Sequence, residues 1–314
     1  MAQQTLTLSP ASQPLVRQNS ELSKMLRQIT RNPLSIVGIF FVLIFVGIAV
    51  FAPVIAPPPA GTRDAYLIPR DGFKAEPQPP NAEHLFGTTE GQYDIFYGVI
   101  WGTRTAFLAG LLIVALALVI GLTVGSLAAY FGGWVDDILM RITEIFLAFP
   151  FVIAALTLAA VLQPKLGRGL YTGIIALVVF GWMSYARLIR GDILSTKERE
   201  YVLAARSLGV RDWRILFRHI LPNSIFPVIV VASLEIGTYV LSFAALSFLG
   251  LGAELGYADW GQMLALSRNW ITNLSKYWYI VVYPGMALLF FVLGWNLIGD
   301  AIRDIVDPRL RGTK

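Results

Sequence analysis

The side chains that most often perform catalysis or bind metal ions are scarce in this chain. It has no cysteine, which excludes disulfides, thiolate zinc sites, iron–sulfur clusters and thiol nucleophiles. Its two histidines, His84 and His219, are too few for a histidine metal cluster, so no metal site is expected. No Gly-x-x-x-x-Gly-Lys-Ser/Thr, Gly-x-Ser-x-Gly or His-Glu-x-x-His motif occurs. The sequence therefore predicts no catalytic residues and argues against an enzyme.

Two glutamates lie inside long apolar stretches, where charged side chains are rare and usually face a cavity or a partner. Glu144 follows Arg141 by three residues, and this spacing favours a structural ion pair on one helix face. Glu235 has no basic neighbour on its own helix. Two roles stay open for it. It could be structural, or it could face a cavity and meet the amino terminus of a peptide or another cationic group.

The segment 191–222 is long for a connection inside a membrane bundle, and its pattern predicts two short helices. Ser195 and Glu198 have the spacing of a capping box, which would start a helix over 196–208. Gly209 is suited to the left-handed residue that ends such a helix. A second helix is expected to follow and to end at a proline, which cannot continue it.

One face of the first helix has small or apolar side chains at the spacing i, i+3, i+4 and i+7, namely Tyr201, Ala204, Ala205 and Leu208. Charged residues flank this face, among them Glu200 and Arg206. The two alanines leave a shallow notch where another surface can approach closely. Two interpretations stay open: an amphipathic helix on the lipid headgroups, or a docking surface for a soluble partner.

The elements that position these residues are membrane spans. Apolar residues make up 56% of the 314 and charged residues 14%, against roughly 45–50% and 25% in soluble domains. A bilayer-spanning helix needs about 20 mostly apolar residues. Six segments qualify: Leu34–Ala56, Thr105–Phe131, Ile142–Leu162, Thr172–Ile189, Ser224–Leu249 and Tyr279–Gly299. The predicted fold class is an all-α polytopic membrane protein with six transmembrane helices.

Lysine and arginine set the orientation, because they accumulate on the cytoplasmic side of the membrane. With the N-terminus inside, 17 of the 25 basic residues are cytoplasmic and 8 are not. Both termini are therefore expected in the cytoplasm, and the net charge of +5 reflects topology rather than a nucleic-acid partner. The predicted organisation is a cytoplasmic N-terminal tail 1–33, a first anchor helix 34–56, an extracytoplasmic loop 57–104, a core transmembrane domain 105–300 that includes the cytoplasmic loop 191–222, and a cytoplasmic tail 301–314.

Several runs of residues resemble one protein family. Residues 200–209, Glu-Tyr-Val-Leu-Ala-Ala-Arg-Ser-Leu-Gly, with 218–223, Arg-His-Ile-Leu-Pro-Asn, resemble the EAA loop of ABC importer permeases. The runs 246–252, 260–264, 296–300 and 307–311 fit one branch of them, with 141–150 and 86–88 upstream. Over residues 25–312 the chain resembles the C-type permease subunit of dipeptide, oligopeptide and nickel importers.

The resemblance implies a type I ABC importer architecture and a heteromeric complex. Its partners would be a sister permease, two ATP-binding cassette ATPase subunits and an extracytoplasmic solute-binding protein in the inner membrane of a prokaryote. No cofactor would bind this chain, because ATP and Mg²⁺ would bind the ATPase subunits. The ATPase-coupling loop would comprise Glu200, Tyr201, Ala204, Ala205, Arg206, Leu208, Gly209, Arg211, Asp212 and Pro222. The translocation pathway would include Glu235, Phe243 and Glu144.

The chain departs from the family pattern at three places. Leu203 stands where the EAA motif usually has a glutamate, which removes a charge from the expected docking surface. Phe243 stands where the family usually has a glutamate in the fifth span. Gln92-Tyr93 replaces a common Gly-Arg in the outer loop.

Other functions are compatible with the composition. An ion-coupled secondary transporter would use Glu144, Glu235 and Asp300 as a proton or sodium relay and would need no other chain. A membrane scaffold would bind a soluble protein through the basic loop without solute flux. If the chain is an importer permease, its substrate could be a dipeptide, an oligopeptide, an oligosaccharide or a nickel chelate.

Overall fold

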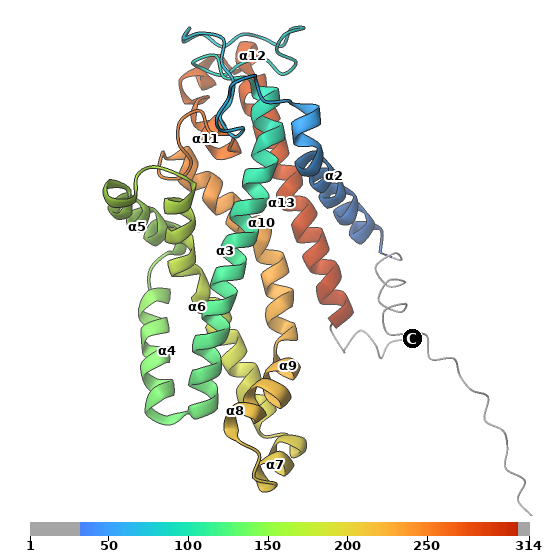
Figure 1. Ribbon diagram of the computed structural model, residues 1–314, viewed down its shortest axis with the longest axis vertical. Coiled ribbons are helices and arrows are strands. Elements are labelled where there is room, and N and C mark those ends of the chain that lie inside the picture. Colours follow the sequence, from blue (N-terminus) through green and yellow to red (C-terminus); the bar gives the residue numbers. More distant parts are fainter. Residues whose placement is uncertain (1–31, 307–314) are drawn as a thin grey trace, which may run out of the picture.

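The computed structural model describes residues 32–306, and within this range the chain is helical apart from its loops and three isolated β-bridges. The long helices, shown in Figure 1, are α2 (Pro33–Ile55), α3 (Ile95–Phe131), α4 (Gly133–Leu147), α5 (Phe151–Leu166), α6 (Leu170–Lys197), α10 (Phe226–Phe248) and α13 (Tyr279–Val306). The short helices are α7 (Glu200–Ser207), α8 (Asp212–Ile215), α9 (Leu221–Ser224), α11 (Trp260–Ala265) and α12 (Leu274–Tyr277), with a π turn at Leu216–Ile220 and a 3-10 turn at Arg268–Asn273. Residues 1–31 of the predicted N-terminal tail 1–33 and residues 307–314 of the predicted C-terminal tail 301–314 lie outside the described residues.

Within residues 32–306, five helices are long and apolar enough to cross a membrane, and a sixth span is added if α4 and α5 together count as one. The prediction of a single continuous span over Ile142–Leu162 is wrong, because α4 and α5 meet at a bend of 88°. The break falls at Ala148 to Pro150. Pro150 disfavours helical geometry at the residue before it, which ends α4 there. An average of hydropathy along the chain cannot detect such a bend.

The helix α3 begins at Ile95, ten residues before the predicted start at Thr105. Asp94 is its N-cap, and the Asp94 carboxylate accepts a hydrogen bond of 2.8 Å from the Tyr97 N–H. A contact with α11 stabilises these additional residues, because Trp260 Nε1 donates to the Val99 carbonyl at 3.1 Å. The predicted loop 57–104 is therefore a loop only as far as residue 94.

Two glycines allow α3 and α6 to pack closely. A Cβ added at Gly121 would lie 2.6 Å from the Trp182 carbonyl oxygen, and one at Gly125 would overlap the Ala186 carbonyl oxygen. The two helices therefore meet backbone to backbone, as small residues permit in membrane proteins. Because α6 leads directly into α7, this contact fixes the base of the segment that the sequence marks as a docking loop.

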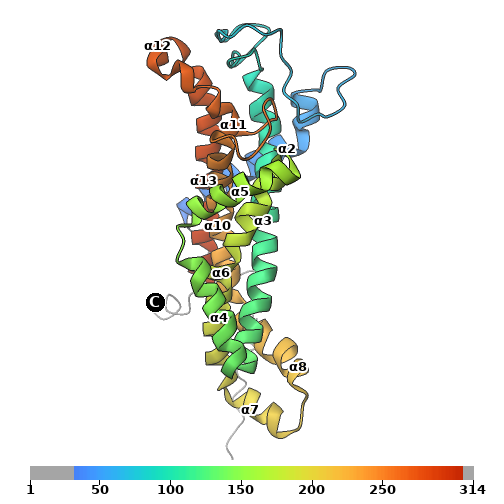
Figure 2. The ribbon, with the colours of Figure 1, turned by 90° about the vertical axis from the view of Figure 1, so that its left-hand side faces the viewer.

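The molecule is long and narrow, and its longest loops lie toward two opposite ends (Figures 1 and 2). We call the end formed by α7, α8 and the turn between them the α7 end. We call the end formed by residues 57–94 and 252–278 the α12 end. The two parts of the α12 end are joined by a bridge between Leu67 and Tyr257 and by a 2.9 Å ion pair between Glu76 and Lys276.

Candidate functional site

The helix α7 begins later than predicted. Ser195 lies within α6, which continues to Lys197, so the expected capping box of Ser195 and Glu198 is wrong. Tertiary contacts extend α6: Lys197 Nζ donates to the Ala129 carbonyl at 3.1 Å, and the Thr196 hydroxyl lies 3.0 Å from that of Ser224. These contacts keep α6 helical beyond Ser195, so the capping pattern in the sequence does not start a new helix there.

The short helix α7 has one buried and one exposed apolar side. Val202 and Ala205 are buried against the bundle. Ala205 therefore does not share an outward face with Tyr201, Ala204 and Leu208, as the sequence pattern had predicted. The outward side consists of Tyr201, Leu203, Ala204 and Leu208, which we call the α7 surface. Leu208 is 83% exposed.

Gly209 has the left-handed conformation that was predicted, with φ +72°. Its N–H donates to the Arg206 carbonyl at 2.9 Å, and the Val210 N–H donates to the Ala205 carbonyl at 3.2 Å. These two bonds form the Schellman motif that ends a helix in a fixed direction. The turn sets the angle between α7 and α8.

The second part of the loop is held to the bundle. Asp212 begins α8, and its carboxylate accepts a 2.5 Å hydrogen bond from the Tyr130 hydroxyl of α3. Arg211 precedes α8, and the Arg206 guanidinium lies 5.9 Å from the centre of the Tyr130 ring. Pro222 does not stop the helix as predicted, because the chain remains helical to Ser224 through a π turn that accommodates the missing proline N–H.

Sequence reasoning missed an exposed aromatic pair beside this turn. The rings of Trp213 and Phe217 lie 4.2 Å apart, and both side chains are exposed. Their i, i+4 spacing was the available signal.

Glu200 occupies the first turn of α7, where a negative charge suits the helix dipole.

A cavity of about 140 Å³ lies between α6, α10 and the bend from α4 to α5. Five of the eleven residues that line it are aromatic, and its polar residues include Glu235 and Ser184. The Glu235 Oε2 atom is buried and has no hydrogen-bond partner within residues 32–306. Glu235 therefore lines a cavity, and a role for it there stays a prediction.

This cavity adjoins an open groove along α6, which in turn adjoins a further groove. A groove of about 470 Å³ shares Leu147 and Ser184 with it. A third, of about 780 Å³, shares Arg187 with the second groove. Because positions 181, 184, 187 and 191 follow one face of α6, the series runs from Glu235 toward the α7 end.

The other two residues predicted for the pathway lie outside the Glu235 cavity. Glu144 forms the expected ion pair with Arg141, at 3.4 Å, on the exposed side of α4, and both residues line the third groove. Phe243 is 2% exposed, and its ring packs against Gly173 of α6. Phe243 is part of the helix packing and is absent from the lining of the Glu235 cavity.

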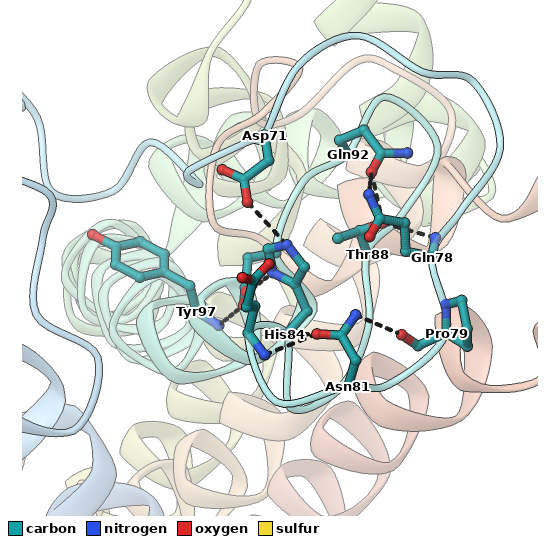
Figure 3. A network of polar contacts seen from close by, with 10 residues as sticks. Asp71, Gln78, Pro79, Asn81, His84, Thr88, Gln92 and Tyr97 are labelled. Carbon is teal, nitrogen blue, oxygen red and sulfur yellow. Dashed lines mark hydrogen bonds and ion pairs between the residues drawn. The ribbon is translucent and has the colours of Figure 1, made fainter.

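The α12 end is ordered by a polar network, shown in Figure 3. His84 is buried, with Nδ1 at 2.7 Å from Asp94 and Nε2 at 3.0 Å from Asp71. Next to it, Gln92 has φ +65° and donates from its amide to the Glu76 carbonyl at 2.6 Å. These contacts connect the N-cap of α3 to the loop around it.

The structure is a bundle of apolar helices with the exposed α7 surface at one end and a line of cavities along α6. This is the architecture of a membrane transport subunit, and comparisons of the sequence with known protein families agree. The family model "binding-protein-dependent transport system inner membrane component" matches residues 121–312, and the model for the N-terminal transmembrane domain of oligopeptide transport permease C matches residues 20–80. The chain therefore belongs to the family of binding-protein-dependent transport system inner membrane components, and it is a non-catalytic permease subunit of an ABC importer.

Three relatives are similar over nearly their whole length. The dipeptide transport system permease protein DppC of Alkalihalophilus pseudofirmus is 37% identical, covering 99% of this chain and 98% of the relative. The glutathione transport system permease protein GsiD of Pectobacterium atrosepticum is 34% identical over 96% of each chain. The probable D,D-dipeptide transport system permease protein DdpC of Escherichia coli is 37% identical over 92% of each.

A solved structure supports the fold. A chain of the MetNI methionine ABC transporter, determined in inward-facing conformations, aligns with a TM-score of 0.55 and 19% identity. The alignment covers 68% of this chain and 98% of that one. The predicted class, an all-helical type I importer permease, is confirmed.

Proposed function

We propose that this chain is one of two permease subunits in an ATP-driven importer of peptides. The other parts are a sister permease, two ATPase subunits that bind ATP and Mg²⁺, and an extracytoplasmic binding protein. The complex lies in the cytoplasmic membrane of a prokaryote, with the α7 end and both termini in the cytoplasm. The names of the relatives, which are dipeptide and glutathione permeases, support a peptide substrate.

The α7 surface is the observation that most strongly supports coupling to an ATPase. An isolated helix of eight residues is unstable in water, so α7 persists because Val202 and Ala205 pack on the bundle. Its opposite side nevertheless exposes Tyr201, Leu203 and Leu208. A rigid, exposed apolar surface such as the α7 surface, at the end of a membrane helix, fits a cleft in a soluble subunit. Leu203, in place of the usual glutamate, makes this contact more apolar.

The connections of α7 explain how movement of an ATPase would reach the membrane. The helix follows α6 after two residues, and the contact between Thr196 and Ser224 joins α6 to the chain that enters α10. When the ATPase subunits close, α7 moves with them and tilts α6 and α10 together relative to the rest of the complex. The transport pathway then changes the side of the membrane to which it opens, which is a rigid-body mechanism of alternating access.

The test is co-expression with the sister permease and the ATPase subunits, followed by purification and uptake in proteoliposomes with the binding protein. ATP-dependent accumulation of a labelled dipeptide is expected. A chain that transports alone under an ion gradient would overturn the proposal in favour of a secondary transporter.

Two aspartate substitutions separate docking from folding. Leu208→Asp places a charge on the α7 surface and should prevent co-purification of the ATPase subunits while the two permeases stay together. Leu255→Asp alters a comparably exposed leucine at the α12 end and should leave co-purification unchanged. Loss of the ATPase subunits in both variants, or in neither, would contradict a docking role for the α7 surface.

A further inference from the structure

The Glu235 cavity has an unusual combination of one carboxylate and aromatic walls. A buried carboxylate oxygen without a partner is strongly unfavourable unless a positive group or a proton compensates it. The Tyr185 hydroxyl, also buried, lies near this carboxylate without forming a hydrogen bond of normal geometry. The Tyr239 hydroxyl also lies near this carboxylate, but it donates its hydrogen to the Gly181 carbonyl at 3.0 Å. The carboxylate is thus left available to a ligand.

The remaining wall favours one kind of ligand. It contains the aromatic residues Phe146, Phe149, Phe151, Phe180 and Tyr239. Aromatic faces attract ammonium groups through cation–π interactions, and these interactions are stronger away from water. A single carboxylate offers too few oxygens for a divalent cation, which needs about six. The wall also contains few hydrogen-bonding groups for a sugar.

The size of the cavity limits what can enter it. A volume of about 140 Å³ is smaller than the roughly 300 Å³ at which sites for whole small molecules begin. It is close to the roughly 150 Å³ that holds one benzene-sized group. The cavity can therefore take one end of a peptide, and the groove of about 470 Å³ beyond Leu147 and Ser184 can take the rest.

We propose that the Glu235 cavity binds the protonated amino terminus of the peptide during its passage through the membrane. The inference rests on the proposed peptide-import function and adds to it a residue and a chemical group. It makes the permease itself selective for solutes with a free amino group, in addition to any selection by the binding protein.

The first experiment measures uptake in proteoliposomes containing the complete importer. The substrates are a dipeptide and its N-acetyl form, each delivered by the binding protein at saturating concentration. Wild type is compared with Glu235→Gln. The quantity of interest is the effect of the substitution on the free peptide divided by its effect on the acetylated one, because this ratio cancels any preference of the binding protein.

Glu235→Gln should lower uptake of the free peptide about tenfold more than uptake of the acetylated one, the size expected for losing one charged hydrogen bond. Glu144→Gln is the matched control, since it removes a carboxylate from outside the cavity. Whatever its effect on uptake, that effect should be equal for the two peptides. An equal effect of Glu235→Gln on both would overturn the inference. Absence of any uptake by wild type would instead refute the proposed import function.

The second experiment needs neither a variant nor the binding protein. A hydrophobic carbodiimide should modify Glu235 in the wild-type complex of permeases and ATPases, and mass spectrometry measures the extent. The free dipeptide should slow this modification at least fivefold, and the N-acetyl dipeptide should not. Equal protection by both peptides, protection by sodium ions alone, or no protection by either peptide would each overturn the inference.

Discussion

Arg190 on α6 binds Asp136 on α4 through two parallel contacts, Nε to Oδ1 and Nη2 to Oδ2, both of 2.6 Å. This bidentate geometry is the strongest form of an arginine–carboxylate pair. The rest of α4 is loosely held, because Thr143 is its single buried residue. Since α4 also supplies Phe146 and Leu147 to the Glu235 cavity, the pair fixes one wall of that cavity.

Breaking this pair should loosen α4. Because Arg190 is about one-third exposed, we expect Asp136→Asn to cost about 1–2 kcal/mol of stability, which is less than a fully buried pair would cost. Thermal unfolding of the detergent-solubilised complex measures the cost. Arg190→Lys keeps the positive charge but cannot form the bidentate contact, so it should cost nearly as much stability. A double-mutant cycle of Asp136→Asn and Arg190→Gln that gives no interaction energy would contradict this account.

Gln92 explains one departure from the family pattern. Its φ of +65° is the only positive value at a non-glycine position within residues 32–306. It stands at the position where the sequence resemblance predicts a glycine. Its buried amide compensates by donating to the Glu76 and Lys74 carbonyls. Gln92→Gly should lose these bonds but relieve the strain, whereas Gln92→Ala loses the bonds and keeps the strain. Alanine should therefore be about 1 kcal/mol less stable than glycine in thermal unfolding. Equal stability of the two variants would mean that the left-handed conformation is not strained.

The sequence predicted the features that depend on composition and on single residues. Five of the six spans and the left-handed Gly209 follow from apolar length and from the steric freedom of glycine. The side of α7 that packs inward could not be predicted. Val202 with Ala205 and Tyr201 with Ala204 have the same spacing, and only the position of the bundle decides between them. The Glu235 cavity likewise depends on the bend at Pro150, which brings α5 beside residues distant in the sequence.

Asp259 should make stability depend on pH. The residue caps α11 by accepting the Gln262 N–H at 2.8 Å, and burial raises the pKa of its carboxyl to about 6. The folded state therefore binds this proton more tightly than the unfolded state, whose pKa is about 4. The contribution of this carboxyl to the free energy of unfolding is therefore greatest below pH 4. It falls by up to about 3 kcal/mol as the pH rises through 6.

Asp259→Asn keeps the capping oxygen but cannot titrate. The variant should be more stable than wild type at pH 8, and the difference should shrink toward zero at pH 4. Thermal unfolding of both proteins from pH 4 to 8 measures it. Parallel curves for the two proteins would show that the Asp259 carboxyl does not change its charge in this range.

Gly209 offers the sharpest test of coupling, because its substitution changes conformation without a steric clash. No atom lies within 4 Å of a Cβ added there, yet φ is +72°, where a β-branched residue is strongly disfavoured. Valine would relieve the strain by turning the backbone, which redirects α7 relative to α8 and misaligns the α7 surface. Asparagine tolerates the left-handed conformation and is the matched control.

In Gly209→Val we therefore expect an assembled complex that hydrolyses ATP but imports little peptide. Gly209→Asn should keep more than half of wild-type import. The measurement is the number of ATP molecules hydrolysed per peptide imported in proteoliposomes, which should rise at least tenfold in the valine variant and less than twofold in the asparagine variant. A wild-type ratio in Gly209→Val would show that the angle set by this turn does not transmit the ATPase movement. Failure of both variants to retain the ATPase subunits would mean that the turn itself is the contact.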